Sequence, residues 1–348
     1  MAADHRLALH ATLPDRYAHH EVLASSIDHR GRLAALVADP AQGFTPIPPS
    51  SALRPPPPSS ALRPPPPSSA LRPPPRYDAT AVICDGAEIR KITLTDLDLR
   101  FTHIDTLGEG IVLAAARCKP AGVDIERFRW LVQEDELSLT DNVQVIDADG
   151  QTRSAFYAGD GIEQLLTDPQ GNIWISYSDE SNYWFPNPDG TRSYSLMIGL
   201  ARWDSHGSSP WMAPSHTVDV VWCHCYALNV GHDVVHACPY TDFPLIEIDS
   251  DGVRSITPNP VKRCTGLAVS GSELAFLDQH RASGGCRWEI RRARREDGAV
   301  TETDQANLLL PDDRHPTGWA RGNIGRDGTL WLHENGNPRR WYRYDLNP

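Results

Sequence analysis

The chain has 348 residues and a formal net charge of −12, with 40% hydrophobic and 22% charged residues. This balance is typical of a soluble globular protein, but the negative charge disfavours contact with a nucleic-acid backbone, which requires a basic surface. The one basic run, RWEIRRARR at 287–295, is followed directly by Glu296 and Asp297. We therefore interpret it as a solvated outer strand, and we expect no nucleic-acid partner.

The N-terminal segment MAADHRLALHATLPDRY is interrupted by charged residues where a signal peptide needs an unbroken apolar stretch. No window reaches the roughly 18 apolar residues of a membrane-spanning helix. The seven cysteines are an odd number, which excludes a fully paired extracellular disulfide framework. We expect a cytoplasmic protein with reduced thiols and no membrane partner.

A tandem repeat lies early in the chain. SSALRPPPP occupies 50–58 and 59–67, and 68–75 repeats it with one proline fewer. Proline fixes φ and lacks an amide donor, so these tracts favour extended polyproline II structure. We predict a Pro-rich, disordered-like low-complexity insertion over 41–76. Either it binds a partner domain that reads polyproline II, or it is a tolerated repeat in a long loop.

Hairpin-forming units recur along the rest of the chain. The clearest is GIEQLLTDPQGNIWISYSDE at 161–180, which reads as a strand at 162–167, a tight turn at 168–171 and a strand at 173–178. A turn of this composition between alternating strands is typical of an antiparallel hairpin. Similar units begin at Glu21, Phe101, Cys225, Cys264 and Gly318.

A third strand follows most of these hairpins, and a turn with a short fourth strand usually comes after it. The predicted third strands lie at 80–86, 142–150, 199–207, 245–252, 286–294 and 340–346. The unit is therefore a four-stranded up-and-down sheet that repeats about every 40 to 60 residues once the insertion is removed, a spacing typical of propeller blades.

We predict an all-β fold, a single six-bladed β-propeller over 1–348, with the 41–76 insertion inside its first blade. Seven blades and a two-sheet sandwich are the alternatives, and no long segment has the 3.6-residue period of a helix. The last unit ends after three strands. HRLALHATL at 5–13 is therefore predicted to supply the missing fourth strand and close the ring.

Polar residues cluster where the inner strands begin and where the second strands end, which in a propeller is one rim of the central channel. The first group is Glu163, His224, Cys264 and Arg321. The second group is Tyr177, Asp179, Glu180, Tyr240, Asp242, Asp278, His280 and Glu334. Such a rim could ligate Ca²⁺ or Zn²⁺ or provide an acid–base pair, or it could be a polar rim without catalysis.

The segment WCHCYALNVGHDVVHACP at 222–239 concentrates cysteine and histidine. Cys223 and Cys225 would lie on one face of a strand, with Cys238 close to opposite Cys225 across the hairpin. These three thiols are either a zinc site or small apolar side chains in a blade core. No other cofactor is predicted.

Common catalytic motifs are missing from the sequence. There is no G-x-S-x-G, no P-loop, no G-x-G-x-x-G after a strand and no H-E-x-x-H. DADG at 147–150 and DSDG at 249–252 resemble the opening of a calcium loop, but neither has the glutamate and helix that an EF-hand needs. We interpret both as turns in which an aspartate caps its own backbone.

Three segments carry a resemblance to known proteins: 159–180, GLARWD at 199–204, and CYALNVGHDVVHACPYTDFPLIEID at 225–249. They resemble an uncharacterised family of bacterial cytoplasmic propeller-like proteins, from about Tyr77 onward. TDPQGNIW at 167–174 is distantly similar to regucalcin/gluconolactonase and NHL-type six-bladed propellers. The lactonases bind a divalent cation through a Glu, Asn and Asp set. This resemblance offers Glu163 as one ligand, without a matching Asn-Asp pair.

Two functions follow. The first is a binding or scaffold module that uses one rim of the central channel for a protein or small-molecule partner. The second is a metal-dependent hydrolase or lactonase acting at the mouth near Glu163 and Asp179. We favour the module because the sequence contains no recognisable catalytic set.

Overall fold

The computed structural model describes residues 3–40, 76–116, 141–179, 198–215, 217, 219–282 and 285–347. The predicted insertion lies outside these residues except for Arg76, and the candidate site residue Glu180 also lies outside them.

Three antiparallel sheets have four strands each, in sequence order. The first contains β3 (Glu21–Ile27), β4 (Leu33–Ala38), β5 (Tyr77–Asp85) and β6 (Ala87–Leu97). The second contains β7 (His103–Leu107), β8 (Gly110–Ala114), β9 (Val143–Ile146) and β10 (Thr152–Phe156). The third contains β11 (Ile162–Thr167), β12 (Ile173–Tyr177), β13 (Leu200–Trp203) and β14 (Trp211–Met212).

Two larger sheets complete the fold. One has the order β19 (Gly266–Ser270), β20 (Glu273–Ala282), β21 (Gly285–Glu296), β22 (Ala299–Leu309) and β1 (Ala3–Arg6). The other runs β18 (Gly252–Thr257), β17 (Leu245–Asp249), β16 (Val235–Tyr240), β15 (His224–Val230), β23 (Ala320–Arg326), β24 (Thr329–Glu334), β25 (Arg340–Asp345) and β2 (Ala8–Thr12). Short 3-10 turns lie at Asp15–Tyr17 and Ala213–Ser215.

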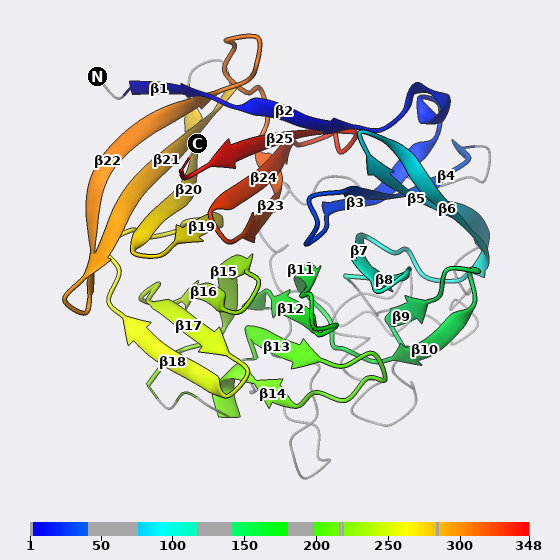
Figure 1. Cartoon of the computed structure of the whole chain (residues 1–348), viewed down its shortest axis with the longest axis horizontal. Coiled ribbons are helices and arrows are strands. Elements are labelled where there is room, and N and C mark those ends of the chain that lie inside the picture. Colours follow the sequence, from blue (N-terminus) through cyan, green and yellow to red (C-terminus); the bar gives the residue numbers. More distant parts are fainter. Residues whose placement is uncertain are drawn as a thin grey trace, which may run out of the picture.

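The sheets are arranged radially, with β3, β7, β11, β15, β19 and β23 innermost (Figure 1). This is a β-propeller, and the predicted all-β class is confirmed. The predicted hairpins coincide with β3–β4, β7–β8, β11–β12, β15–β16, β19–β20 and β23–β24. Among the described residues no helix is long and apolar enough to span a membrane.

Aspartates at the start of tight turns explain why these hairpins form locally. The Asp168 Oδ1 accepts hydrogen bonds from the amides of Gln170 (3.0 Å) and Asn172 (2.9 Å), and Gly171 turns the chain at φ 87°. Asp147 accepts in the same way from the amides of residues 149 and 151, and Asp249 accepts from the amide of residue 251. The interpretation of DADG and DSDG as self-capped turns is therefore confirmed.

The core lies between neighbouring sheets. Every residue of β4, β8 and β12 is buried, because these strands carry packed sheets on both faces. One apolar cluster joins the first two sheets through Leu36, Phe101 and Ile111, all fully buried. The apolar core thus lies between the sheets, whereas polar groups gather at the ends of the inner strands.

The segment predicted to supply a fourth strand to the last unit divides into two strands. β2 pairs antiparallel with β25, from Ala8 opposite Arg343 to Thr12 opposite Arg340. β1 instead pairs in parallel with β22, from Ala3 opposite Ala306 to Arg6 opposite Leu309. The sequence did not predict this second pairing, and the segment crosses both sheets in Figure 1.

The basic run of 287–295 lies on β21, where its arginines are engaged by neighbouring side chains. Arg291 forms an ion pair with Glu302, Arg294 with Glu273, and Arg295 with Glu247. The positive charge of this strand is thus largely neutralised within the fold.

Candidate functional site

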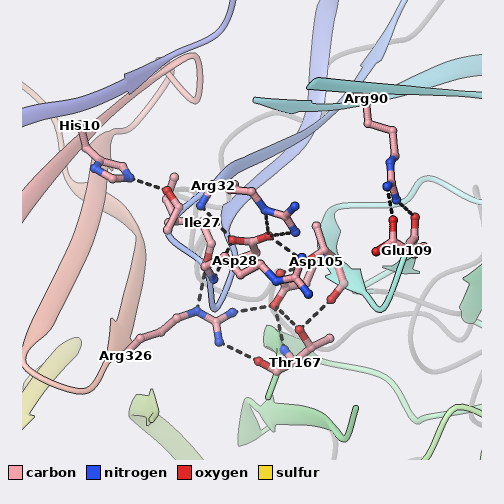
Figure 2. A network of polar contacts seen from close by, with 12 residues as sticks. His10, Ile27, Asp28, Arg32, Arg90, Asp105, Glu109, Thr167 and Arg326 are labelled. Carbon is pink, nitrogen blue, oxygen red and sulfur yellow. Dashed lines mark hydrogen bonds and ion pairs between the residues drawn. The ribbon is translucent and has the colours of Figure 1, made fainter. Parts of the chain in front are cut away.

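The inner strands end in a buried polar network, shown in Figure 2, that we call the polar plug: Asp28, Asp105, Thr106, Thr167 and Arg326. The Arg326 guanidinium donates to Asp105 Oδ2 (2.7 Å), to the carbonyl of Thr167 (2.7 Å) and to the carbonyl of Ile27 (3.2 Å). One side chain on β23 therefore holds the ends of β3, β7 and β11 together.

Both carboxylates of the polar plug are fully buried and fully bonded. Asp105 also accepts from the amides of Thr106 (2.8 Å) and Thr167 (2.7 Å). Asp28 accepts from the Thr106 hydroxyl (2.9 Å) and from Arg32. Burial raises the pKa of Asp105 to about 6, although Arg326 opposes the rise. Burial also acts to raise the pKa of Asp28, but hydrogen bonds from Arg32 outweigh it and the pKa falls below its usual range.

At the opposite end the inner strands begin, and we call this end the mouth. Four of them are bulged there: β3 between Val22 and Ala24, β11 between Ile162 and Gln164, β15 between Cys225 and Ala227, and β23 between Arg321 and Ile324. The extra residues are Leu23, Glu163, Tyr226 and the pair Gly322–Asn323. A bulge re-aims a side chain without disturbing the ladder on either side, and bulges are common beside binding sites.

A cavity of about 250 Å³ opens at the mouth between β3, β7, β11 and β23. We call it the mouth cavity; its polar lining includes Ser26, His103, Glu163, Gln164 and His333. Gly322 also lines it, at φ 78°, and a Cβ at that position would lie 2.2 Å from the Trp341 ring. Only glycine therefore fits at this bulge.

His103 is held as a neutral ring. Its Nε2 is 3.1 Å from the carbonyl of Glu163, which can only accept, so Nε2 carries the proton. The Thr102 hydroxyl accepts from the Ala116 amide and lies beside Nδ1, at 3.1 Å in both cases. Burial lowers the pKa of His103 and outweighs the hydrogen bonds to the backbone of Glu163 and Ala114, which act to raise it.

His333 is the second neutral imidazole of the mouth cavity. Its Nδ1 donates to the carbonyl of Glu334 at 2.9 Å, so Nε2 is left as an acceptor. The ring packs edge-on against Trp341 and is only 8% exposed. Burial lowers its pKa to about 4, and the ring stays uncharged at neutral pH.

Two further lining residues carry buried polar atoms without a hydrogen bond from the described part of the chain: the Ser26 Oγ and the Gln164 Oε1. Ser26 is only 4% exposed. Gln164 donates through Nε2 to the carbonyl of Asn323 at 3.4 Å, which leaves Oε1 free to accept. Buried polar atoms are nearly always satisfied by protein, water or ligand, so this pair marks a place for a polar guest.

Some of the residues predicted for the rim come together at or beside the mouth. Glu163 lines the mouth cavity, and Arg321 is exposed at the edge of the β23 bulge. His224 and Tyr240 face each other across the β15–β16 hairpin. Asp179 is exposed directly after β12, and its charge acts on His224.

Other predicted residues lie elsewhere. Asp242 lines a separate outer groove with Pro244 and Ile256. Asp278 was expected at the end of a second strand, but β20 continues to Ala282 and Asp278 sits within it, paired with Glu289. The remaining rim candidates are His280 in the same strand, buried Tyr177 and Cys264, and Glu334 bound to Arg314.

The thiols are packed in the core beside the mouth. Cys225 is opposite Pro239 and Cys238 opposite Ala227, so the two cysteines are one position out of register. Both are buried, and Cys223 is half-buried. The contact with the Cys264 thiol, together with burial, raises the pKa of Cys238. Across the described ranges no group of three or more His, Cys, Asp or Glu side chains is placed to hold a metal ion.

Sequence reasoning missed Ser26, His103, Gln164 and His333, which supply most of the polar lining of the mouth cavity. Ser26 and Gln164 carry no motif, and they meet only because distant strands converge. The Gly322–Asn323 pair was a usable signal, since two such residues early in a strand are typical of a bulge.

No protein-family model matches the chain, and no curated protein sequence does. Solved structures with similar folds include virginiamycin B lyase from Staphylococcus aureus, at 9% identity over 96% of this chain and 97% of that one, with a TM-score of 0.44. The β-propeller domain of Swd1 from Myceliophteria thermophila is 10% identical over 97% and 96%, with a TM-score of 0.43. Aldose sugar dehydrogenase from Streptomyces coelicolor has the same identity, coverages and TM-score.

Proposed function

We propose that the protein is a propeller binding module whose mouth cavity takes a small, neutral, polyhydroxylated ligand. The observation that carries this proposal is the buried Ser26 hydroxyl, which lines the mouth cavity without a hydrogen-bond partner among the described residues. The Ser26 Oγ itself has less than 1 Å² of accessible area, so the lining has to open slightly for a ligand hydroxyl to become its partner, and the free energy lost by leaving this group unpaired would then be recovered on binding.

The chemistry of the lining favours hydroxyl groups. Gln164 Oε1 and His333 Nε2 are acceptors, so a matching ligand has to donate hydrogen bonds. Both imidazoles are uncharged at neutral pH, so the buried lining offers no charge to an ionic ligand, and the Glu163 carboxylate of the lining is exposed to solvent. The volume of about 250 Å³ lies just below the range of roughly 300–1,000 Å³ for drug-sized ligands, so a compact ligand suits it.

We also infer that the ring has six blades and that β2 closes it. The eight-stranded sheet is joined between β15 and β23 by the single pair Asn229–Gly325, and Asn229 also donates to the carbonyl of Leu267 on β19, which fits inner strands of three successive blades that converge on the channel. Pairing of β2 with β25 then completes the last blade. Removal of residues 1–15 is expected to destabilise the whole fold. An unchanged melting temperature would contradict this inference.

A charge series of sugars tests the ligand class. We expect glucose to bind in calorimetric titration at neutral pH, and both the cationic glucosamine and the anionic glucuronate to bind more weakly. Ser26→Val, which removes the hydroxyl and adds bulk to the mouth cavity, should abolish glucose binding. Asp242→Asn, in the separate outer groove, is the matched control and should leave it unchanged.

Two results of this series would overturn the proposal. One is a charged sugar that binds at least as tightly as glucose. The other is that Ser26→Val leaves glucose binding unchanged, or that the parent protein does not bind glucose at all.

The metal-dependent hydrolase has less support, because Glu163 is the one member of the expected ligand set that lines the mouth cavity. Its test is a rise in melting temperature with Ca²⁺ or Zn²⁺ that Glu163→Gln removes. If that rise appears, and activity on a lactone is lost in the same variant, the enzyme replaces the binding module. A cytoplasmic location and a polyproline-reading partner for the 41–76 insertion remain proposals from the sequence.

A further inference from the structure

Beside the mouth, the β15–β16 hairpin carries four packed rings that we call the aromatic rim cluster: His224, Tyr226, Tyr240 and Phe243. The His224 and Tyr226 rings stack with centroids 4.0 Å apart and planes 26° apart. Phe243 meets Tyr226 edge-on at 5.4 Å and Tyr240 edge-on at 5.7 Å. Tyr226 is thus the centre of the cluster.

Irregular backbone builds this cluster. Tyr226 is the extra residue of the β15 bulge, so it is aimed independently of the ladder. Phe243, just after β16, has φ 54°. A bulky side chain rarely adopts that conformation, and such outliers concentrate at binding sites where the surroundings hold them in place.

The cluster is only partly covered. Phe243 is 5% exposed and forms its base, whereas Tyr240 is 43% exposed. Within the described residues, the Tyr226 and Tyr240 hydroxyls make no hydrogen bond, so hydroxyl chemistry does not explain why two tyrosines stand here. Tyr226 is half-buried with His224 stacked on one face, so Tyr240 is the ring that the cluster offers most openly to solvent.

The carboxylate of Asp179 acts electrostatically on the aromatic rim cluster. Asp179 is exposed after β12 and makes no hydrogen bond or ion pair with the described residues. Burial and then the Asp179 charge raise the pKa of Tyr226, and burial lowers the pKa of His224 while Asp179 opposes it. Arg263 also acts on Tyr226, more weakly than Asp179. Asp179 therefore lies near enough to act on both the His224 and the Tyr226 rings.

We propose that the aromatic rim cluster and Asp179 form a second binding site, for the trimethylammonium group of an organic cation. Ring faces carry negative quadrupole charge and attract a cation held within about 6 Å of the ring centroid. Asp179 adds a full negative charge, and because it is exposed it does not carry the desolvation cost of a buried carboxylate. The net charge of −12 raises the local concentration of cations at the surface in the same direction.

Choline and its neutral isostere 3,3-dimethylbutan-1-ol test this site, because they differ in charge and share a shape. We expect choline to bind saturably, with upfield shifts of its N-methyl proton signal from the tyrosine rings. The neutral isostere should bind about tenfold more weakly, since it lacks the cation–π attraction. A peptide carrying trimethyllysine, run beside choline, distinguishes a protein-borne ammonium from a free one.

Variants separate the rings from the charge. Tyr240→Leu should abolish the choline shifts, Tyr240→Phe should keep them, and Asp179→Asn should weaken binding several-fold with a smaller salt dependence. Ile256→Ala, exposed in the outer groove, is the control. Equal binding of choline and its isostere, or choline binding that survives Tyr240→Leu, would overturn the proposal. Glucose binding should persist in Tyr240→Leu, so the two sites succeed or fail separately.

Discussion

The two ends of the inner strands use polar groups in opposite ways. At the polar plug, charged side chains are buried and every carboxylate oxygen of Asp105 is bonded. At the mouth the strands bulge and the carboxylate of Glu163 is exposed, and the mouth cavity keeps unpaired atoms at Gln164 and, nearer the end of β3, at Ser26. A fully hydrogen-bonded network stabilises one arrangement of its side chains, whereas unpaired polar groups can still form hydrogen bonds with a ligand. The polar plug therefore holds the inner strands together, and the mouth is the end for which we propose a ligand.

Breaking the buried ion pair should have the largest effect. Asp105→Ala leaves the Arg326 guanidinium buried without its partner, and we expect a loss of about 3–5 kcal/mol in the free energy of unfolding. At the mouth, Arg321→Ala should change stability by no more than about 0.5 kcal/mol, because Arg321 is exposed. Urea denaturation measures both variants.

The double variant Asp105→Leu with Arg326→Met is the control for this prediction. It removes both charges, so it should be clearly more stable than either single variant. If the loss in the free energy of unfolding of the double variant equals the sum of the losses in the two single variants, Asp105 and Arg326 do not stabilise the fold as an ion pair.

Acid should act on the two ends with opposite sign. Unfolded His333 takes up a proton near pH 6.5, but the folded ring resists until about pH 4, so its contribution to stability falls as the pH drops through that window. Folded Asp105 takes up a proton near pH 6 and its unfolded form near 3.8, so protonation favours the folded state and stability rises as the pH drops.

Between pH 7 and pH 5 these opposing contributions amount to about 2 kcal/mol for His333 and about 1 kcal/mol for Asp105. His333→Gln should therefore lose less stability on acidification than the parent protein, and Asp105→Asn should lose more. Melting temperatures of the three proteins at the two pH values test the signs. Parallel profiles would mean that neither group senses pH as inferred.

A further pair of variants separates a bonded hydroxyl from an unbonded one. Thr167→Val removes the donor to the carbonyl of Thr106, at 2.8 Å in the polar plug, and should cost about 1–3 kcal/mol. Ser26→Ala removes a hydroxyl with no partner and should be neutral or slightly stabilising in the absence of ligand. A loss in Ser26→Ala comparable to that in Thr167→Val would remove the distinction between the two ends.

Local features of the fold were predictable from the sequence. The Asp168–Gly171 turn and its flanking strands lie within a few residues of one another, so the residues that determine them are adjacent in the chain. The repeated unit then indicates the propeller, because one sheet pattern recurs at a regular spacing. The interpretation of the Asp147 and Asp249 turns succeeded for the same reason.

Features made by distant segments were not predictable. Ser26, Gln164 and His333 come from three different sheets, and nothing local marks them as neighbours. The polar plug joins Asp105 to Arg326 across 221 positions. The prediction that Asp278 lies at the end of a strand was wrong, because the other hairpins are shorter, whereas β20 and β21 extend their pairing to Ala282 and Gly285.

The shared pairing of residues 3–12 has a consequence for how the molecule is made. β1 and β2 precede their partner strands, which lie at 299–309 and 340–345, by almost 300 residues or more. During synthesis this segment must therefore remain unpaired, with open strand edges, until those partner strands have been translated. Folding should finish in a late, cooperative step, and the nascent chain should depend on chaperones until then.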